Sequence, residues 1–448
     1  MESFVNTPVT VNIKNQKSLF NPFLPEFRNN PYPYYERLRS QDPIHFSFMG
    51  TWVITRYTDA VAVLRDPRFS VDMRRWGNYQ DIRFRETQGE LGPLGRITSK
   101  WMLFIDPPDH IRLKRLASKA FTPQIVENLR PYIEEIVDTK LNQVASRGKL
   151  DVVADLAHPL PFVVIAQMLG VPPEDREKLQ KWSEDVALCL DPMMSIDIFE
   201  HLNQVVIEFA EYFRNLIAQR RQQRQDDLLS ALITARDEQD QLTEEELLGT
   251  CILLFVAGHE TTVKLISNGV LALLNHPDQM TKLKQEPILI ESAVEELLRY
   301  DSPVQLTVRT ATEDVEIGGK TIHQGQQVFI CLGSVHRDPA QFVNADQLDI
   351  TRQDNRHLAF SYGIHACLGN VLARVQAQVA INALIQRFSH LQIATEKLEW
   401  HKTIILRGLK SLPVSFRDCQ LKKYPIAVSA EEAETEESHH HLRSHHIG

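Results

Sequence analysis

The most strongly patterned part of the chain is a long apolar segment at residues 247–276. Thr243 and Glu246 precede it at the spacing of a capping box, and Pro277 follows as a stop signal. Residues 251–257 are apolar on every side, which predicts a helix buried within a protein core. The uninterrupted apolar run is far shorter than the roughly 20 residues that a membrane span requires. We therefore predict a core helix here.

Elsewhere the pattern predicts many helices and a few short strands. A first helix is expected at residues 30–42, and a strand at 52–56 leads into a helix at 59–65. Amphipathic helices bounded by prolines dominate residues 123–236. Further short strands are predicted at 315–317, 327–331 and 404–414. The expected fold class is mainly α with a small β part.

The segments that carry chemistry lie between residues 257 and 369 and must meet at one site, which argues for a single large domain. We place that domain at residues 25–420, after an irregular N-terminal lead at 1–24. Residues 421–448 are acidic and rich in histidine, and we expect a disordered tail there. Its histidine cluster is interpreted as a cloning remnant or an adventitious metal binder.

Composition narrows the class of protein. A net charge of −9 argues against nucleic acid as a partner. The five cysteines show no paired or CxxC spacing, which is typical of a reduced, cytoplasmic protein without a structural zinc site. The first residues carry neither a signal peptide nor an anchor helix, so we expect no membrane anchor and a monomer in the cytoplasm.

One cysteine stands in an unusual context. Cys367 lies on a turn punctuated by glycines, directly before a stretch with a helical pattern. The amide groups and the dipole at a helix N-terminus favour a thiolate, and Ala366 and Gly369 are small enough for backbone donors to approach the sulfur. By itself a single cysteine is more often a small buried apolar residue.

The surrounding spacing changes that interpretation. Phe360, Gly363, His365, Cys367 and Gly369 occupy matched positions within ten residues, and the segment resembles the ligand loop of the haem-thiolate monooxygenases, the cytochrome P450 family. The resemblance implies the family's fold, with haem b between a long distal helix and the helix that follows the cysteine loop. It also implies Cys367 as the iron ligand, with Phe360, His365 and Gly369 in the cofactor site, and covers roughly residues 20–418.

A second resemblance lies within the apolar segment. Residues 257–262 place a glycine, a carboxylate and two hydroxyls in a helix that is otherwise apolar, at a cost in stability. They are similar to the oxygen-binding groove of the same family, which implies that Thr261 donates a hydrogen bond to bound dioxygen and Glu260 relays protons. The competing interpretation is a helix kink in which the hydroxyls bond back to carbonyls one turn earlier.

A third resemblance is a Glu-x-x-Arg element at Glu296 and Arg299, expected to form a structural ion pair. On an exposed helix such a pair contributes only ~0.3 kcal/mol, but its place between the two preceding motifs matches the family. The family's third partner is an arginine where this chain has Gln347, so Arg352 and Arg356 are the alternatives.

The haem propionates require cations, and the resemblance supplies four candidates. They are His110, Lys114, Arg309 and His365. Lys114 stands where an arginine is usual, so the positive charge is kept while the bidentate fork is lost.

The substrate pocket is expected to be chiefly apolar and suited to a lipophilic small molecule. Its lining is assigned by position to residues 74–101, with arginines at 74, 75 and 83, and to Val256, Ala257, Val304, Leu306 and Leu409. The sequence does not distinguish a fatty acid from a terpenoid, a steroid or a polyketide, or hydroxylation from epoxidation.

No dinucleotide-binding fingerprint follows a strand, so electrons from NAD(P)H must come through another protein. The resemblance implies a ferredoxin or flavodoxin with its reductase. We expect it to dock near a basic patch of Arg112, Arg115, Lys119 and Arg374. Two alternatives stay open: a peroxide-driven haem-thiolate hydroxylase and a non-catalytic haem sensor.

Overall fold

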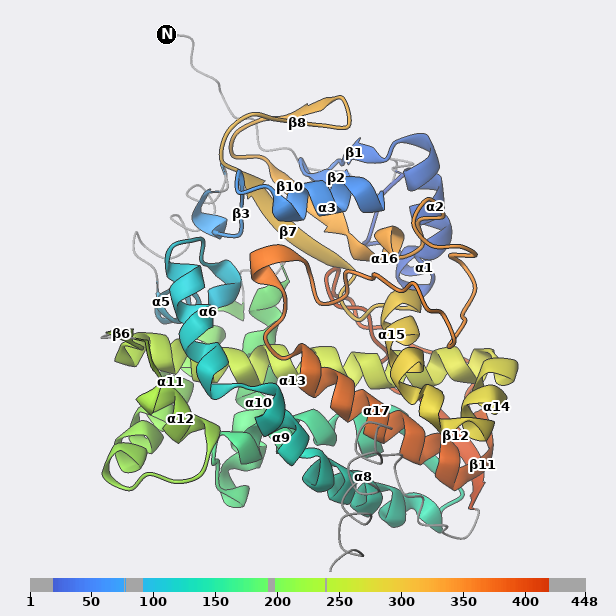
Figure 1. The fold of residues 1–448 in the computed structure, drawn as a ribbon. Helices are drawn as coiled ribbons and strands as arrows, with labels where there is room; N and C mark the ends of the chain where they lie inside the picture. Colours follow the sequence, from blue (N-terminus) through green and yellow to red (C-terminus); the bar gives the residue numbers. More distant parts are fainter. Residues whose placement is uncertain (1–18, 76, 78–91, 192–197, 238–239, 419–448) are drawn as a thin grey trace, which may run out of the picture.

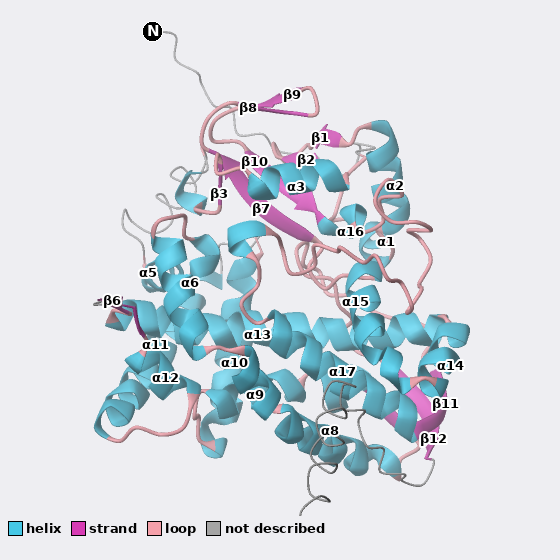
Figure 2. Cartoon of the chain, in the orientation of Figure 1, coloured by secondary structure: helices cyan, strands magenta, loops and turns pink. Residues whose placement is uncertain are grey.

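A computed structural model describes residues 19–75, 77, 92–191, 198–237 and 240–418. Helices make up most of this part of the chain (Figure 2). Their bounds are α1 Pro25–Asn29, α2 Tyr32–Gln41, α3 Tyr57–Arg65, α5 Pro93–Thr98, α6 Asp109–Ala120, α7 Pro123–Asn128, α8 Arg130–Ala145, α9 Pro159–Met168, α10 Arg176–Ala187, α11 Phe199–Gln222, α12 Leu228–Thr234, α13 Glu244–Asn275, α14 Pro277–Gln285, α15 Ile290–Tyr300, α16 Leu332–Val335 and α17 Asn370–Arg387. A mainly α fold in one domain is therefore confirmed.

The strands are short. Their bounds are β1 Ile44–Phe46, β2 Trp52–Ile54, β3 Phe69–Ser70, β4 Lys149–Asp151, β5 Arg236–Asp237, β6 Asp240–Gln241, β7 Leu306–Ala311, β8 Val315–Ile317, β9 Lys320–Ile322, β10 Gln327–Cys331, β11 Phe388–Ile393 and β12 Pro413–Asp418. A five-stranded sheet has the order β1-β2-β10-β7-β3, with β2 parallel to β10 and the other pairs antiparallel. It lies at one end of the molecule, above the helices in Figure 1.

Helix α13 crosses the middle of the molecule, and α17 packs against it (Figure 1). The predicted capping box is confirmed: the Glu246 amide donates to Thr243 Oγ1 at 3.3 Å, and the Thr243 amide donates to Glu246 Oε2 at 2.9 Å. The helix ends two residues before Pro277, which lacks the amide hydrogen needed to continue it.

By length and composition α13 is apolar enough to cross a membrane. However, 72% of its most apolar 18-residue window is buried inside the protein, as in a core helix. Neighbouring helices cover it, because α9, α17 and α10 all pack on it. The structure thus gives this helix the core position that its sequence predicts.

One predicted strand is wrong. Residues 404–414 were expected to be extended, but the strand begins only at Pro413. The preceding segment forms a loop with two isolated bridges, Val304 to Leu406 and Trp400 to Leu409. Its apolar side chains are buried by packing against the core, which produces the same hydrophobic pattern as a buried strand.

Candidate active site

The loop before α17 wraps its backbone around Cys367. Ser361 and Gly363 have φ values of 63° and 73°, which turn the chain sharply. The Cys367 amide then donates to the Phe360 carbonyl at 2.9 Å, and the Asn370 side chain donates to the Cys367 carbonyl at 2.7 Å. The backbone of the cysteine is therefore fixed from both sides.

The ionisation of this thiol differs from the sequence expectation. Desolvation by the loop raises the pKa of the Cys367 thiol, and the Gly369 amide, Lys114 and Arg374 lower it by less. Helix α17 starts at Asn370, three positions after the sulfur, and a helix dipole acts mainly within the first turn. At neutral pH the chain alone holds a thiol, and a coordinating metal ion would remove its proton.

Lys114 on α6 does not extend into solvent. Its ammonium donates to the carbonyls of Ile364 and Ala366, both at 2.6 Å, and so ties α6 to the cysteine loop. Burial lowers the pKa of Lys114, and Cys367 acts in the opposite direction. The residue expected to bind a propionate thus also supports the loop that carries the candidate iron ligand.

The other three candidates for propionate binding form a crowded cluster of basic groups. The rings of His110 and His365 lie 4.0 Å apart between centroids. Burial, then Lys114, lowers the pKa of His110 to about 4, and burial, then His110, Arg309 and Lys114, lowers that of His365 to about 3. Burial also lowers the pKa of Arg309 to about 10, opposed by Asp106. Such a cluster favours a bound anion.

Two buried polar atoms without partners also indicate a bound group in this region. The indole N–H of Trp101 and Nδ1 of His110 have no hydrogen-bond partner among the described residues, and Trp101 is fully buried. Buried polar atoms without partners are rare and costly. A ligand with acceptor oxygens would satisfy the indole N–H, and also Nδ1 in the tautomer that carries its proton there. The residues present therefore fit a haem with its two carboxylates. Trp101 was not among the residues predicted from sequence to bind the cofactor.

The middle of α13 is more open than the rest of that helix. Ala257, Gly258, Glu260 and Thr261 are half-buried, whereas almost every neighbouring residue of the helix is buried. Thr261 Oγ1 donates to the Ala257 carbonyl at 2.8 Å, and Thr262 Oγ1 donates to the Gly258 carbonyl at 3.2 Å. The hydroxyls thus bond back by one turn, as the competing interpretation expected.

Glu260 has a cationic partner that sequence reasoning missed. Lys264, one turn later on α13, donates a hydrogen bond to its carboxylate. Burial opposes ionisation, but the charge and hydrogen bond of Lys264, with His259 and His401, lower the pKa of Glu260 to about 2. Their (i, i+4) spacing is visible in the sequence and was the signal that could have identified this pair.

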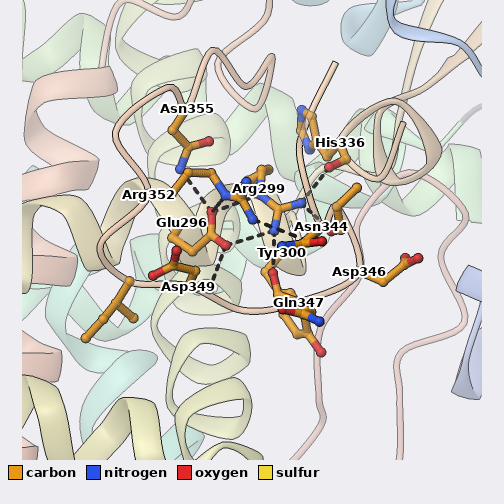
Figure 3. Close-up of polar contacts among 12 residues, drawn as sticks. Glu296, Arg299, Tyr300, His336, Asn344, Asp346, Gln347, Asp349, Arg352 and Asn355 are labelled. Atoms are coloured by element: carbon orange, nitrogen blue, oxygen red, sulfur yellow. Dashed lines mark hydrogen bonds and ion pairs between the residues drawn. The ribbon is translucent and has the colours of Figure 1, made fainter. Parts of the chain in front are cut away.

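Glu296 and Arg299 form an ion pair whose two side chains are fully buried, with Oε1 and Nη2 2.8 Å apart (Figure 3). Arg352 supplies the third member, because its Nε lies 3.0 Å from Glu296 Oε2. Arg356 is instead exposed and pairs with Asp354. The structure therefore decides between the two arginines that the sequence left open.

The residues assigned to the substrate pocket separate into two groups. Ala257 and Val304 are half-buried, whereas Val256, Leu306 and Leu409 are at most 2% exposed and belong to the packed core. Most of the segment 74–101, with the arginine at 83, lies outside the described residues. The two described arginines at 74 and 75 face the carboxylates of Asp72 and Asp106, respectively.

The predicted basic patch is weaker than its sequence suggested. Arg112 pairs with Asp240 at 3.2 Å and with Glu246, and Arg374 pairs with Glu295 at 2.6 Å. Because those carboxylates neutralise two of the four cations, the local positive potential is smaller than a count of arginines implies.

The cysteine loop, the basic groups beside it and the polar break in a core helix are the features expected of a haem-thiolate protein. Comparison with known proteins agrees. The family model for Cytochrome P450 matches residues 93–411. The biotin biosynthesis cytochrome P450 of Bacillus subtilis is 44% identical over 394 residues, covering 87% of this chain and 97% of the relative.

Two solved structures show the same fold. P450BioI in complex with hexadec-9Z-enoic acid ligated acyl carrier protein has a TM-score of 0.81 and 44% identity, over 88% of this chain and 99% of that one. The myxobacterial CYP267B1 in complex with myristic acid has a TM-score of 0.80 and 39% identity, over 89% and 99%. The chain belongs to the cytochrome P450 family. It is a haem-dependent monooxygenase that uses O2 and receives electrons from NAD(P)H through redox partners.

Proposed function

We propose that this monooxygenase oxidises the hydrocarbon part of a long-chain fatty acyl compound, either free or attached to a carrier protein. The observation that carries the proposal is that two similar solved proteins, at 44% and 39% identity, hold acyl ligands. Apolar side chains support it, because Ala257 and Val304 are apolar and only half-buried. An alkyl chain gains free energy from such a surface in proportion to the apolar area that it buries.

In this proposal Cys367 is the iron ligand, and His110, Lys114, Arg309 and His365 hold the propionates. Phe360 and Gly369 shape the loop on the cysteine side: the Phe360 carbonyl accepts the Cys367 amide, and the Gly369 amide faces the sulfur. The haem, when bound through a thiolate, supplies oxygen activation.

Thr261 and Glu260 are proposed to handle the protons that the reaction consumes. The Thr261 hydroxyl donates a hydrogen bond to the Ala257 carbonyl. The Thr261 oxygen can still accept a hydrogen bond from a donor on the open side of the helix. Glu260 is half-buried, and protonation of its carboxylate competes with the contact to Lys264.

We further propose that a separate ferredoxin or flavodoxin delivers electrons on the cysteine side and that the protein works as a monomer in the cytoplasm. The absence of a dinucleotide fingerprint supports the first point. Cys251, Cys331 and Cys367 form no disulfide in the described part of the chain, which suits a reducing compartment.

Titration of the ferric protein tests the substrate class. Saturated and unsaturated fatty acids, the same acyl chains loaded on a carrier protein, a macrolide and a steroid would each be added while the haem spectrum is recorded. A spectral shift with the free acids alone supports a free fatty acid as the substrate. Tighter binding of the loaded carrier protein supports a carrier-bound acyl chain. A shift with the macrolide or steroid and none with any acyl compound contradicts the proposal.

Turnover of the bound compound separates the reaction classes. The protein would be supplied with NAD(P)H and a surrogate ferredoxin system, or with hydrogen peroxide alone. Product that requires the electron carrier is the expected result. Product with peroxide alone would identify the peroxide-driven alternative, and binding without product under either condition would identify a sensor.

A further inference from the structure

Lys264 occupies an unusual position for a lysine. Its side chain is only 5% exposed, and it lies on α13 one turn after Glu260, whose side chain is 20% exposed. A lysine is almost never buried to this extent unless its charge has a partner, and here the partner is the Glu260 carboxylate. The pair therefore cannot be treated as one of the weak exposed pairs that are common on helix surfaces.

The path of the lysine side chain is fixed by a glycine. A Cβ atom added at Gly408 would lie 2.3 Å from Lys264 Cγ, 2.9 Å from Cδ and 3.1 Å from Cε. The alkyl chain of Lys264 thus runs directly over the backbone of residue 408. Because this backbone limits the alternative routes, the ammonium is directed to the Glu260 carboxylate rather than toward solvent.

Several other charged or titratable groups face this pair from the surrounding elements. His259 adjoins Glu260 on α13, and its Nε2 donates a hydrogen bond to the His158 carbonyl, 2.9 Å away. His401, on the loop that contains Gly408, is exposed and interacts with both members of the pair. Lys410 and His158 also interact electrostatically with His401.

The bonding of Thr261 adds the second half of the argument. Its hydroxyl donates to the Ala257 carbonyl, and Glu260 accepts from Lys264, so each side chain of the oxygen-groove motif is engaged by α13 itself. A carboxylate that is ionised and held by an ammonium has no proton to give. Because the ammonium stabilises the ionised form of Glu260, loss or weakening of this contact favours uptake of a proton from solvent.

We propose that Lys264 is a positioning residue that holds Glu260 ionised and turned along α13, so that opening of the Glu260–Lys264 pair precedes each proton transfer through Glu260. The proton that Glu260 takes up comes from solvent and leaves toward the open side of the helix, and the carboxylate then returns to Lys264. This inference rests on the proposed role of Glu260. It adds a step that the Glu260 and Thr261 motif does not contain by itself.

Infrared difference spectroscopy of the haem-loaded protein measures the protonation of Glu260 directly. The carboxylic acid C=O band of Glu260 is assigned by comparing each variant with the same variant that also carries Glu260→Gln. The band that is missing from the second spectrum belongs to Glu260. In Lys264→Met the desolvation of Glu260 is no longer offset, so this band should appear at a higher pH than in the wild type. Each unit of pKa increase multiplies the protonated fraction about tenfold at pH values well above the pKa.

A second variant reaches the pair from the other side. Gly408→Ala leaves both charged residues in place but displaces the Lys264 side chain, and it should move the band in the same direction. Lys410→Met is the matched control, because it removes a lysine of the same loop whose ion pair with Glu399 is exposed, with side chains 46% and 57% accessible. It should leave the band of Glu260 unchanged.

The solvent deuterium isotope effect on product formation reports the gating step. If opening of the pair limits proton delivery in the wild type, this step masks the isotope effect of the proton transfer that follows it. The effect should therefore be larger in Lys264→Met and Gly408→Ala than in the wild type and in Lys410→Met. An unchanged infrared band in both variants, or a shifted band with an unchanged isotope effect, overturns the inference. The carbon monoxide difference spectrum of the same samples tests thiolate ligation separately, so failure of the proposed function is recognised by its own signal.

Discussion

Removal of the Glu296 carboxylate should destabilise the protein more than any change to an exposed ion pair. Glu296 is fully buried and accepts hydrogen bonds from Arg299 Nε and Nη2, Arg352 Nε, Asn355 Nδ2 and the Asp349 amide, at 2.8 to 3.1 Å. In Glu296→Gln, the amide NH2 group replaces a carboxylate oxygen and faces N–H groups that had donated hydrogen bonds to that oxygen. The charge of Arg299 is then left buried without its counterion.

The magnitude follows from that uncompensated charge. Breaking a buried ion pair by removing one partner costs about 3–5 kcal/mol, which is a large part of a typical unfolding free energy of about 5–15 kcal/mol. Arg352→Gln should cost less, about 1–3 kcal/mol, because Glu296 keeps both of its contacts with Arg299.

An apolar replacement of both partners should not restore stability. Exchange of a buried ion pair for apolar side chains is often neutral when nothing else depends on it. Here Arg299 also donates to the carbonyls of His336, Ala345 and Gln347, at 2.6 to 2.9 Å (Figure 3). Each buried carbonyl without a donor costs about 1–3 kcal/mol, so the double variant Glu296→Leu with Arg299→Leu should remain destabilised by at least about 3 kcal/mol.

Urea denaturation followed by far-ultraviolet circular dichroism, with haem content measured on the same samples, provides the assay. Arg356→Gln is the control, because Arg356 and Asp354 are 76% and 66% exposed, and its free energy of unfolding should stay within ~0.5 kcal/mol of the wild type. The reasoning is refuted if Glu296→Gln is as stable as this control. A double variant as stable as the wild type would show that the three carbonyls find other donors.

Three further outcomes follow from the site. Cys367→His should abolish the red-shifted carbon monoxide band of thiolate ligation, and a retained band would exclude Cys367 as the ligand. Haem propionates should raise the pKa values of His110 and His365, which are about 4 and about 3 in the protein alone, so that haem binding takes up protons. The haem affinity should therefore fall as the pH rises through the raised pKa values. Titration of the apoprotein with haem at several pH values should show a weaker pH dependence in His110→Phe. Thr261→Ala should increase peroxide release per NAD(P)H consumed, several-fold, while the substrate-induced spectral shift persists; equal peroxide yields in both proteins would argue against its role in proton handling.

Local sequence determined much of the fold because its signals are short-range. The capping box at Thr243 and Glu246, the apolar run after it and Pro277 define α13 almost to the residue. The spacing around Cys367 predicts the iron-ligand loop, and the assignment of Cys367 as the ligand stays a prediction. These features are set by backbone hydrogen bonding and side-chain periodicity within a few residues, which a single sequence records directly.

Long-range contacts decided what the sequence left open. The choice of Arg352 over Arg356 depends on how the segment after β10 folds back onto α15, and the burial of Leu306 depends on its packing against the N-terminal aromatic residues. The net rise in the pKa of Cys367 likewise reflects burial in the tertiary structure, opposed in part by Lys114 on α6. Desolvation and ion pairing depend on distances between residues far apart in the chain, so only the tertiary structure could assign them.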